Sequence, residues 1–179
     1  MAPKKTILLG VTGSIACYKA ADIVTALVKK GHDVTVVMTR DAEEFVAPLT
    51  FQTLSSNRVY TDMFCVPEEW DAKHVSLAKK ADLIVIAPAT ANILGKLAGG
   101  ICDDMLTCTV AASEAPVLIA PAMNDVMYRN RIVQENIGKL KKSGYSFIGP
   151  RTGRLACGYE ALGCLAEVGD IIQQIEKLL

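Results

Sequence analysis

Continuous apolar runs alternate along this chain with longer segments in which apolar residues recur at every third or fourth position. Such runs are typical of strands buried on both faces of a parallel sheet. They predict strands at 6–11, 33–39, 82–88, 116–121 and 145–149. The periodic segments predict helices at 15–30, 42–55 (in pieces, interrupted by Pro48), 74–81, 91–100, 104–113, 127–144 and 169–179. Because strands and helices alternate, we expect an α/β fold with a parallel sheet, helices on both faces and right-handed crossovers.

Residues 150–167 fit neither pattern, because glycine and proline interrupt them repeatedly. A loop of this length in a compact domain is usually a functional flap or is disordered. The segment also carries Cys157. We therefore expect a substrate flap over 150–167.

The composition limits the classes of protein to consider. With 179 residues, 51% of them apolar, the chain is expected to form one domain over 1–179. Lysine and arginine total 19, as do aspartate and glutamate, which gives no electrostatic argument for binding nucleic acid or an acidic membrane. No run approaches the roughly 20 apolar residues of a membrane span. The apolar run near the N-terminus is too short and too broken by glycine for a signal peptide, so we expect a cytoplasmic protein.

The cysteines point to free thiols rather than to a metal site. None of them forms a C-x-x-C pair, and only two histidines are present, so no metal is expected. In a reducing compartment most should be free, and buried ones should be small core residues. The six are Cys17, Cys65, Cys102, Cys108, Cys157 and Cys164.

The segment "GVTGSIACYK" (10–19) joins the first predicted strand to its helix. The amides and dipole of a helix start suit a phosphate, and Gly13 lets a ligand approach the backbone closely. Ser14 can cap the helix or donate its hydroxyl. Because the spacing is not G-x-G-x-x-G, the segment fits an anion site and an ordinary tight turn equally well.

Two later strand ends carry polar residues where an open sheet usually keeps its ligand. In "APATAN" (87–92), Thr90 and Asn92 can bond to a flat ligand or cap a helix, and from the residues alone the cap is slightly favoured. In "APAMN" (120–124), Asn124 is equally a cap or a substrate contact, and Met123 can be core filler.

His74, which precedes the strand at 82–88, is one of two histidines. A lone histidine is usually a surface or capping residue, and His32 beside Gly31 fits that role. At a helix start the dipole favours the neutral ring of His74.

Taken together, the motifs resemble those of the flavin-dependent cysteine decarboxylases. The segments are "GSIACYK", "HVSLAKKADLIVIAPATANILGKLAGG", "DDMLT", "APAMNDVMY" and "LACG", in this order and over almost the whole chain. No one of them is specific, but their combination is. Within this family the chain is most similar to the single-domain phosphopantothenoylcysteine decarboxylases of coenzyme A biosynthesis.

The resemblance implies a Rossmann-like, flavodoxin-like three-layer sandwich that binds FMN between the subunits of a homotrimer or a multiple of it. The substrate implied is 4′-phosphopantothenoylcysteine, with His74 as base, Asn124 and Met123 beside the substrate, and Cys157 as proton donor. The remaining matches are cofactor positions: Gly13, Ser14 and Ile15 in the phosphate-side loop, Thr39, Thr90, Ala91, Asn92 and Ile93 beside the flavin, and Ala122 against its ring.

The implied chemistry explains why a neutral amide stands at position 124. An acylated cysteine offers no sink for the electron pair that CO2 leaves behind. Transient oxidation of its CH2–SH carbon to a thioaldehyde, with FMN as hydride acceptor, creates a sink. Decarboxylation then gives an enethiolate that is reduced and protonated. An arginine would stabilise the departing carboxylate more than the transition state, whereas an amide only orients it.

Two departures from the family pattern concern the flap and the chain length. Gly163, Cys164 and Leu165 stand where many relatives continue toward G-R-M, so we expect different flap contacts there. Cys164 is accordingly a second candidate thiol. No synthetase-like second domain, of the kind fused in many bacterial relatives, is expected.

Four alternatives remain open. A peptidyl-cysteine decarboxylase would use the same three catalytic residues and differ in the flap. A flavin prenyltransferase would be expected to lack the P-A-M-N and A-C-G motifs. A flavin-binding regulator of a phosphatase would carry long acidic extensions. A flavodoxin-type electron carrier would need neither His74 nor Cys157.

Overall fold

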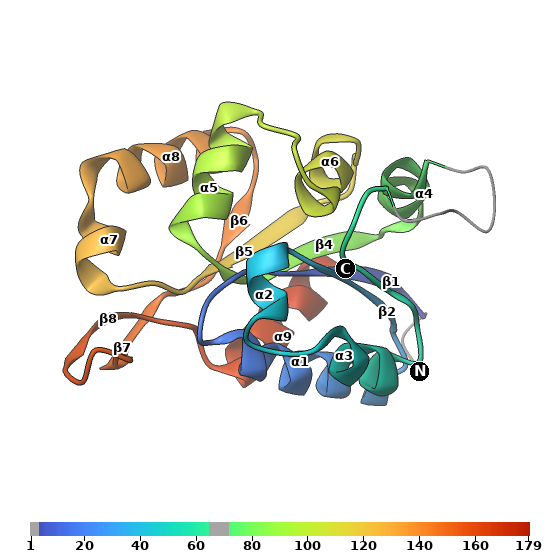
Figure 1. Ribbon diagram of the computed structural model, residues 1–179, viewed down its shortest axis with the longest axis horizontal. Helices are drawn as coiled ribbons and strands as arrows, with labels where there is room; N and C mark the ends of the chain where they lie inside the picture. Colours follow the sequence, from blue (N-terminus) through green and yellow to red (C-terminus); the bar gives the residue numbers. More distant parts are fainter. Residues whose placement is uncertain (1–3, 65–71) are drawn as a thin grey trace.

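The computed structural model describes residues 4–64 and 72–179. At its centre the described chain forms a parallel sheet in the order β3–β2–β1–β4–β5–β6 (Figure 1). The order reverses between β1 and β4, and open α/β sheets bind ligands at such a point, outside the carboxyl ends of the strands. The strands are β1 (Thr6–Val11), β2 (Asp33–Met38), β3 (Val59–Tyr60), β4 (Leu83–Ala89), β5 (Val117–Pro121) and β6 (Ser146–Phe147).

Helices cover both faces of the sheet, so the molecule has three layers (Figure 1). One face carries α1 (Cys17–Lys29), α3 (Pro48–Ser55) and α9 (Val168–Leu178). The other carries α4 (Lys73–Lys80), α5 (Ala91–Gly99), α6 (Met105–Ala111) and α8 (Arg131–Lys142). Two short helices, α2 (Arg40–Glu43) and α7 (Asp125–Arg129), follow the ends of β2 and β5. The predicted three-layer α/β fold is confirmed.

Alternate residues of the strands enter two separate apolar cores. Ile7 and Leu9 of β1 belong to the core under α1 and α9, whereas Leu8 between them belongs to the core under α5 and α6. All three side chains are at most 1% exposed. Because both faces of the strand are buried, its sequence is continuously apolar rather than alternating.

The helices of the structure differ from the predicted ones in two places. The single helix expected at 127–144 is wrong, because the chain forms α7 and α8 with Asn130 between them in an extended conformation. The Asn130 side chain caps α8 by accepting a hydrogen bond from the Ile132 amide at 2.9 Å. The pieces expected at 42–55 are confirmed, but Pro48 begins α3 instead of interrupting a helix.

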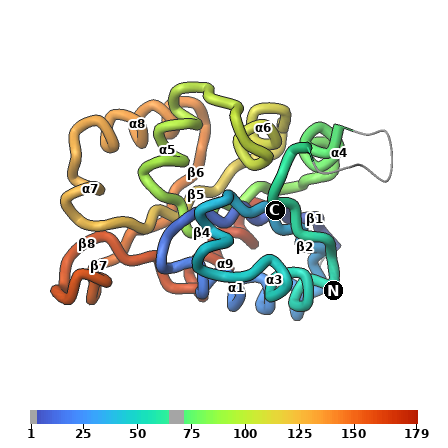
Figure 2. Tube along the Cα trace, in the orientation of Figure 1, coloured from blue at the N-terminus to red at the C-terminus, as the bar shows by residue number. Residues whose placement is uncertain are grey.

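The segment 150–167 was expected to be a loop without strands, and this expectation is wrong. It contains an antiparallel hairpin of β7 (Arg151–Arg154) and β8 (Glu160–Cys164), which lies outside the main sheet beside α7 (Figures 1 and 2). Its glycines conceal the strands in the sequence. A Cβ on Gly163 would lie 2.2 Å from the carbonyl oxygen of Met123, so only glycine permits this close approach.

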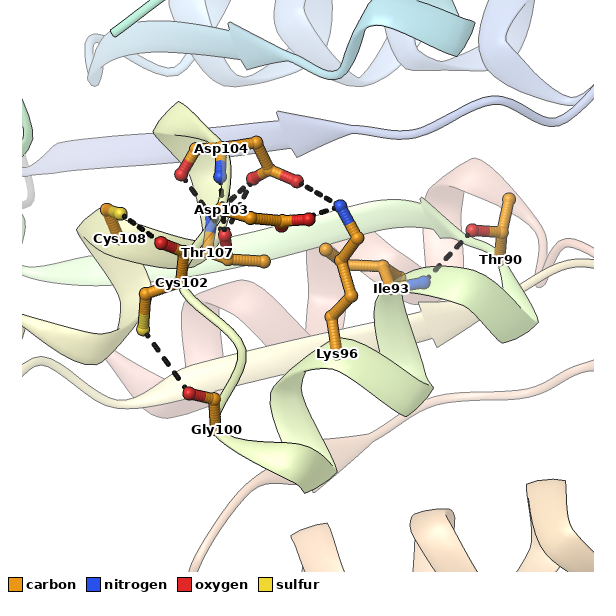
Figure 3. A network of polar contacts seen from close by, with 9 residues as sticks. All are labelled: Thr90, Ile93, Lys96, Gly100, Cys102, Asp103, Asp104, Thr107 and Cys108. Carbon is orange, nitrogen blue, oxygen red and sulfur yellow. Dashed lines mark hydrogen bonds and ion pairs between the residues drawn. The ribbon is translucent and has the colours of Figure 1, made fainter.

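A charged network fastens the end of α5 to the start of α6 (Figure 3). The ammonium group of Lys96 lies 2.7 Å from Asp103 Oδ1 and 2.8 Å from Asp104 Oδ2. Asp104 also caps α6, because its Oδ1 accepts from the Thr107 amide at 2.8 Å while its own amide donates to Thr107 Oγ1 at 3.2 Å. The network fixes α5 relative to α6. The first turn of α5 lies at the carboxyl end of β4.

Candidate active site

The loops that follow β1, β2, β4 and β5 meet at one edge of the sheet, because parallel strands all end on the same side. Hydrogen bonds join these loops across neighbouring strands. Thr12 Oγ1 donates to the Pro88 carbonyl at 2.7 Å and accepts from the Thr90 amide at 3.1 Å. The predicted cofactor positions all follow these strand ends: Gly13, Ser14, Ile15, Thr39, Thr90, Ala91, Asn92, Ile93 and Ala122.

A cavity of about 780 Å³ lies between this edge and the hairpin. That volume is typical of a small-molecule site. The cavity brings together six of the residues predicted from the sequence: Ser14, Ile15, Ala122, Met123, Asn124 and Cys157. Residues more than 100 positions apart in the chain therefore line one space.

The other predicted site residues do not line this cavity. Gly13, Thr39 and 90–93 lie at the same edge of the sheet but outside the lining. His74 is the second residue of α4, which lies far from the hairpin in the single chain (Figures 1 and 2). One copy of the chain thus joins Asn124 to Cys157 but does not bring His74 to them.

Asn124 acts as a helix cap and as a site residue at once. Its Oδ1 accepts hydrogen bonds from the amides of Val126 at 2.9 Å and Met127 at 3.4 Å, which caps α7. Its Nδ2 donates to the sulfur of Cys157 at 3.7 Å and to the hydroxyl of Tyr159 at 3.3 Å. Because the cap occupies the oxygen, the amide presents only its N–H groups to the cavity. Of the two functions weighed for this residue in the sequence, the helix cap is confirmed, and the substrate contact stays a prediction that its place in the cavity lining allows.

The two thiols of the hairpin have different surroundings. Cys157 is exposed at the tip, between β7 and β8, where the Asn124 amide contacts it. Cys164 lies within β8, and its thiol donates to the Arg154 carbonyl at 3.4 Å. The contact with Asn124 therefore distinguishes Cys157 from Cys164.

The five described cysteines are free thiols, as expected, and Cys65 lies outside the described residues. Burial raises the pKa of the Cys17 thiol. This cysteine is fully buried in the core, as expected for a small core residue.

Thr39 carries a polar atom without a partner. Its Oγ1 is buried and forms no hydrogen bond within the described chain. A buried hydroxyl without a partner is destabilising by about 1–3 kcal/mol. Nearby, the loop at Gly13 is packed closely, since a Cβ there would lie 2.4 Å from the Cβ of Asp41. The edge of the sheet thus has an unused donor beside a backbone turn that only glycine allows.

The charged side chains that line the cavity are all cations. They are Lys19, Arg151 and Arg154. The Nε of Arg151 forms an ion pair with Glu167 Oε1 at 2.8 Å. Within the described residues Lys19 and Arg154 have no ion-pair partner. The cavity therefore favours an anionic ligand, a feature that the balanced total charge of the chain concealed.

Sequence reasoning also missed Asp125 and Tyr159. The hydroxyl of Tyr159 donates to Asp125 Oδ1 at 2.6 Å, and its oxygen accepts from Asn124. Asp125 stands within the "APAMNDVMY" motif next to Asn124, and Tyr159 directly follows "LACG", two positions after Cys157. Their pairing could not be found without the hairpin that brings them together.

The parallel sheet, the ligand edge and the anion-favouring cavity define a Rossmann-like α/β protein that binds a small molecule at its strand ends, and the comparisons identify the family. The chain belongs to the flavoprotein family, whose model matches residues 1–179. Among relatives it is similar to a probable phosphopantothenoylcysteine decarboxylase of Streptococcus mutans serotype c. The two are 48% identical over 177 residues, which cover 98% of this chain and 99% of that protein.

Two solved structures share the fold over nearly the whole chain. One is a cysteine-to-serine mutant of PPC decarboxylase complexed with pantothenoylaminoethenethiol, with a TM-score of 0.88, 31% identity and 98% of each chain covered. The other is the FMN-binding protein AtHal3, with a TM-score of 0.87, 32% identity, and 98% of this chain and 96% of that chain covered.

Other relatives are longer. The coenzyme A biosynthesis bifunctional protein CoaBC of Bacillus subtilis is 50% identical over 177 residues, and the chain spans 44% of its length. The described residues, 4–64 and 72–179, contain no group of three histidine, cysteine or acidic residues that could hold a metal, and no helix long and apolar enough to cross a membrane.

Proposed function

We propose that this protein catalyses the FMN-dependent decarboxylation of 4′-phosphopantothenoylcysteine to 4′-phosphopantetheine, a step in coenzyme A biosynthesis. The observation that supports this most is the contact between the Asn124 amide and the Cys157 thiol inside one cavity at the strand ends. After the substrate has been oxidised, such a reaction requires an amide that orients the carboxylate and a group that donates a proton. The relative from S. mutans bears the name of this activity.

The residues at the sheet edge fit FMN. The unpartnered Thr39 hydroxyl can bond to a polar group of the cofactor, and the glycine turn at Gly13 admits a phosphate close to the backbone. Ala122, 3% exposed, offers a small apolar surface for a flat ring. When bound, FMN would supply a reversible two-electron acceptor for the hydride of the substrate's CH2–SH carbon.

Asn124 orients the carboxylate that leaves as CO2. Its oxygen is fixed by the α7 cap, so both N–H groups face the cavity as donors. A neutral donor stabilises the ground-state carboxylate by only about 1 kcal/mol. The amide therefore adds little to the barrier for CO2 loss, because it stabilises the ground-state carboxylate only weakly.

Cys157 supplies the proton to the carbon that has lost CO2. A thiol can act as a general acid toward a carbanion-like carbon. Its place at the exposed tip of the hairpin lets it move over the substrate, which is the flap function expected of 150–167. Closure of the hairpin would also exclude water from the reacting carbon.

His74 would complete the site from a second copy of the chain. It lies in α4, away from the cavity of its own chain, and the family resemblance implies a trimer with the flavin between subunits. In this role the imidazole of His74 takes the proton of the substrate thiol. A homotrimer is accordingly part of the proposal. Exposed apolar side chains beside the cavity, Ile15 at 57% and Tyr18 at 59% exposed, suit burial by another subunit.

The cavity's cations favour the phosphorylated substrate over a peptide. Lys19 and Arg154 have no ion-pair partner among the described residues and can bind a phosphate. A peptidyl-cysteine substrate brings no phosphate, so these cations would have less to bind. The free thiols of the described chain suit the cytoplasmic location predicted from the sequence.

The test is to purify the protein, record its visible absorption spectrum and measure CO2 release. We expect a yellow protein that releases CO2 from 4′-phosphopantothenoylcysteine. Release should be at least about tenfold slower from the dephosphorylated compound at equal low concentration, because one charged hydrogen bond is worth about 1.5–3 kcal/mol. A colourless protein inert to the phosphorylated compound would refute the proposal, and preference for a peptide with a C-terminal cysteine would favour the alternative.

A further inference from the structure

Tyr159 links the tip of the hairpin to the start of α7. It directly precedes β8, and its side chain is 46% exposed. Its hydroxyl donates a 2.6 Å hydrogen bond to Oδ1 of Asp125, the first residue of α7. Asp125 is only 5% exposed. An exposed tip is thus held on a nearly buried carboxylate.

The carboxylate of Asp125 is kept ionised. The Tyr159 hydrogen bond holds the pKa of Asp125 below its ordinary value, with partial burial opposing and the charge of Arg129 assisting. Arg129 forms an ion pair with the second oxygen, Oδ2. A charged acceptor strengthens the hydrogen bond from Tyr159, and the same bond raises the pKa of the Tyr159 hydroxyl.

Because the Tyr159 proton points to Asp125, its oxygen can only accept. The donor is Nδ2 of Asn124 at 3.3 Å, and the same nitrogen lies 3.7 Å from the Cys157 sulfur. The amide nitrogen has two hydrogens. In this state both are directed at the hairpin, one at the tyrosine and one at the cysteine. They are the donors that the substrate carboxylate needs.

We propose that Tyr159, anchored by Asp125, is a positioning residue that returns the Cys157 thiol to the reacting carbon after CO2 has left. This rests on the function proposed above. A bound carboxylate takes the Asn124 donors and displaces both hairpin groups. When the carboxylate departs as CO2, the donors are vacant, and the Tyr159–Asp125 hydrogen bond brings the tip back onto Asn124.

The proton transfer that follows is balanced. The S–H bond of Cys157 breaks and a C–H bond forms at the carbon that carried the carboxylate, using the electron pair of the enethiolate. Cys157 is left as a thiolate and regains its proton from water. The order of CO2 loss and protonation matters. If the Cys157 thiol lay at that carbon before CO2 left, it would occupy the Asn124 N–H groups that orient the carboxylate.

The experiment compares FMN-loaded wild-type protein with Tyr159→Phe, which removes only the hydroxyl. CO2 and the final thiol product are measured together. We expect CO2 release within about threefold of wild type, while the yield of oxidised enethiol per CO2 rises about tenfold, as expected for loss of one hydrogen bond to a charged group. The KM should fall about threefold, since the substrate no longer competes with Tyr159 for the amide.

A second readout does not depend on turnover. Without substrate, alkylation of Cys157 by iodoacetamide, followed by mass spectrometry, should be about fivefold faster in Tyr159→Phe, because the tip is no longer held. Asp125→Asn should shift both readouts in the same direction. The double variant should be no worse than Tyr159→Phe, as for two residues that act as one unit.

Tyr145→Phe is the matched control. Tyr145 is half-buried beside β6, outside the cavity, and its hydroxyl should not affect either readout. An unchanged product ratio and an unchanged alkylation rate in Tyr159→Phe would overturn the inference. If wild-type protein released no CO2, the proposed function would fail, while the alkylation rates would still decide whether Asp125 and Tyr159 hold the hairpin.

Discussion

The amide nitrogen of Asn124 lies 3.7 Å from the sulfur of Cys157, although the two residues are 33 positions apart in the chain. One follows the fifth strand of the sheet and the other stands at the tip of a separate hairpin. In the proposed function, their contact places a carboxylate-binding group beside a proton donor. Substitutions can separate these two proposed roles from each other, from the cofactor site and from the fold.

Replacing Cys157 by serine should separate decarboxylation from protonation. Loss of a general acid slows its step by about 100-fold or more, so CO2 should be released while the oxidised enethiol accumulates and the flavin remains reduced. Product analysis and flavin absorbance measure the two effects. Cys164→Ser, in the same hairpin, should form the normal aminothiol. Normal product at full rate from Cys157→Ser would show that another group is the acid.

Asn124→Asp should weaken substrate binding without removing the flavin. Two carboxylates repel each other, and the KM should rise about tenfold or more. The fold should be unaffected because aspartate also caps helices well. Asn130→Asp is the matched control, since Asn130 caps α8 in the same way but lies outside the cavity. Equal KM values for the two variants would contradict a role for Asn124 in binding the carboxylate.

Thr39→Val should have opposite effects on the cofactor and on the fold. Its hydroxyl has no partner in the described chain, so the FMN-free protein should be as stable as wild type or more stable. The affinity for FMN should fall about tenfold, for want of one hydrogen bond. Fluorescence titration and thermal unfolding measure the two quantities.

The control for this pair of effects is Thr109→Val, because the Thr109 hydroxyl donates to the Met105 carbonyl at 2.7 Å within the core. This variant should destabilise the FMN-free protein by about 1 kcal/mol and leave the FMN affinity unchanged. If Thr39→Val bound FMN as tightly as wild type, the Thr39 hydroxyl would not be a cofactor contact.

Acid should loosen the junction between α5 and α6. Burial alone would raise the pKa of Asp104, but hydrogen bonds from Lys96 and Thr107 together hold it below its ordinary value of 3.8. The stability that Asp104 contributes is therefore fully present above pH 3.8 and is lost as the pH falls through the lower pKa of the folded state.

Asp104→Asn, which keeps a good helix cap, should flatten the dependence of the unfolding free energy on pH in this acidic range. Denaturant titrations at several pH values would measure it. Glu114→Gln is the control, because Glu114 is exposed beyond the end of α6 and its charge should leave the slope nearly unchanged. Identical slopes for wild type and Asp104→Asn would show that Asp104 adds nothing to acid sensitivity.

The sheet could be predicted from the sequence because its strands are buried on both faces, which leaves continuous apolar runs such as 82–88. The two-residue strand β3 is too short to leave such a run, and the strands of the hairpin contain Gly153 and Gly163, which are ordinarily turn signals. At Gly163 the missing side chain makes room for the backbone of Met123. A contact between distant segments, rather than a local preference, explains that glycine.

The residues of the candidate site also fall into two groups, those that the sequence could predict and those that it could not. Residues after the strand ends were predictable, because parallel strands deliver their loops to one edge. The Asn124–Cys157 contact and the Asp125–Tyr159 pair were not, because they depend on where the hairpin lies. The role proposed for His74 requires a neighbouring copy of the chain, and periodicity within one chain contains no information about such a neighbour.

The hairpin has a fixed base and an exposed tip. Its base is tied to the sheet by the Met123 amide, which donates to the Gly163 carbonyl at 3.0 Å. Residues inserted or exchanged between the two strands would reshape the entrance for a different acyl group while the amide and the sheet beneath stayed as they are. Under the proposed function, proteins built on this scaffold can therefore change which substrate they accept while they keep the residues that break the carbon–carbon bond.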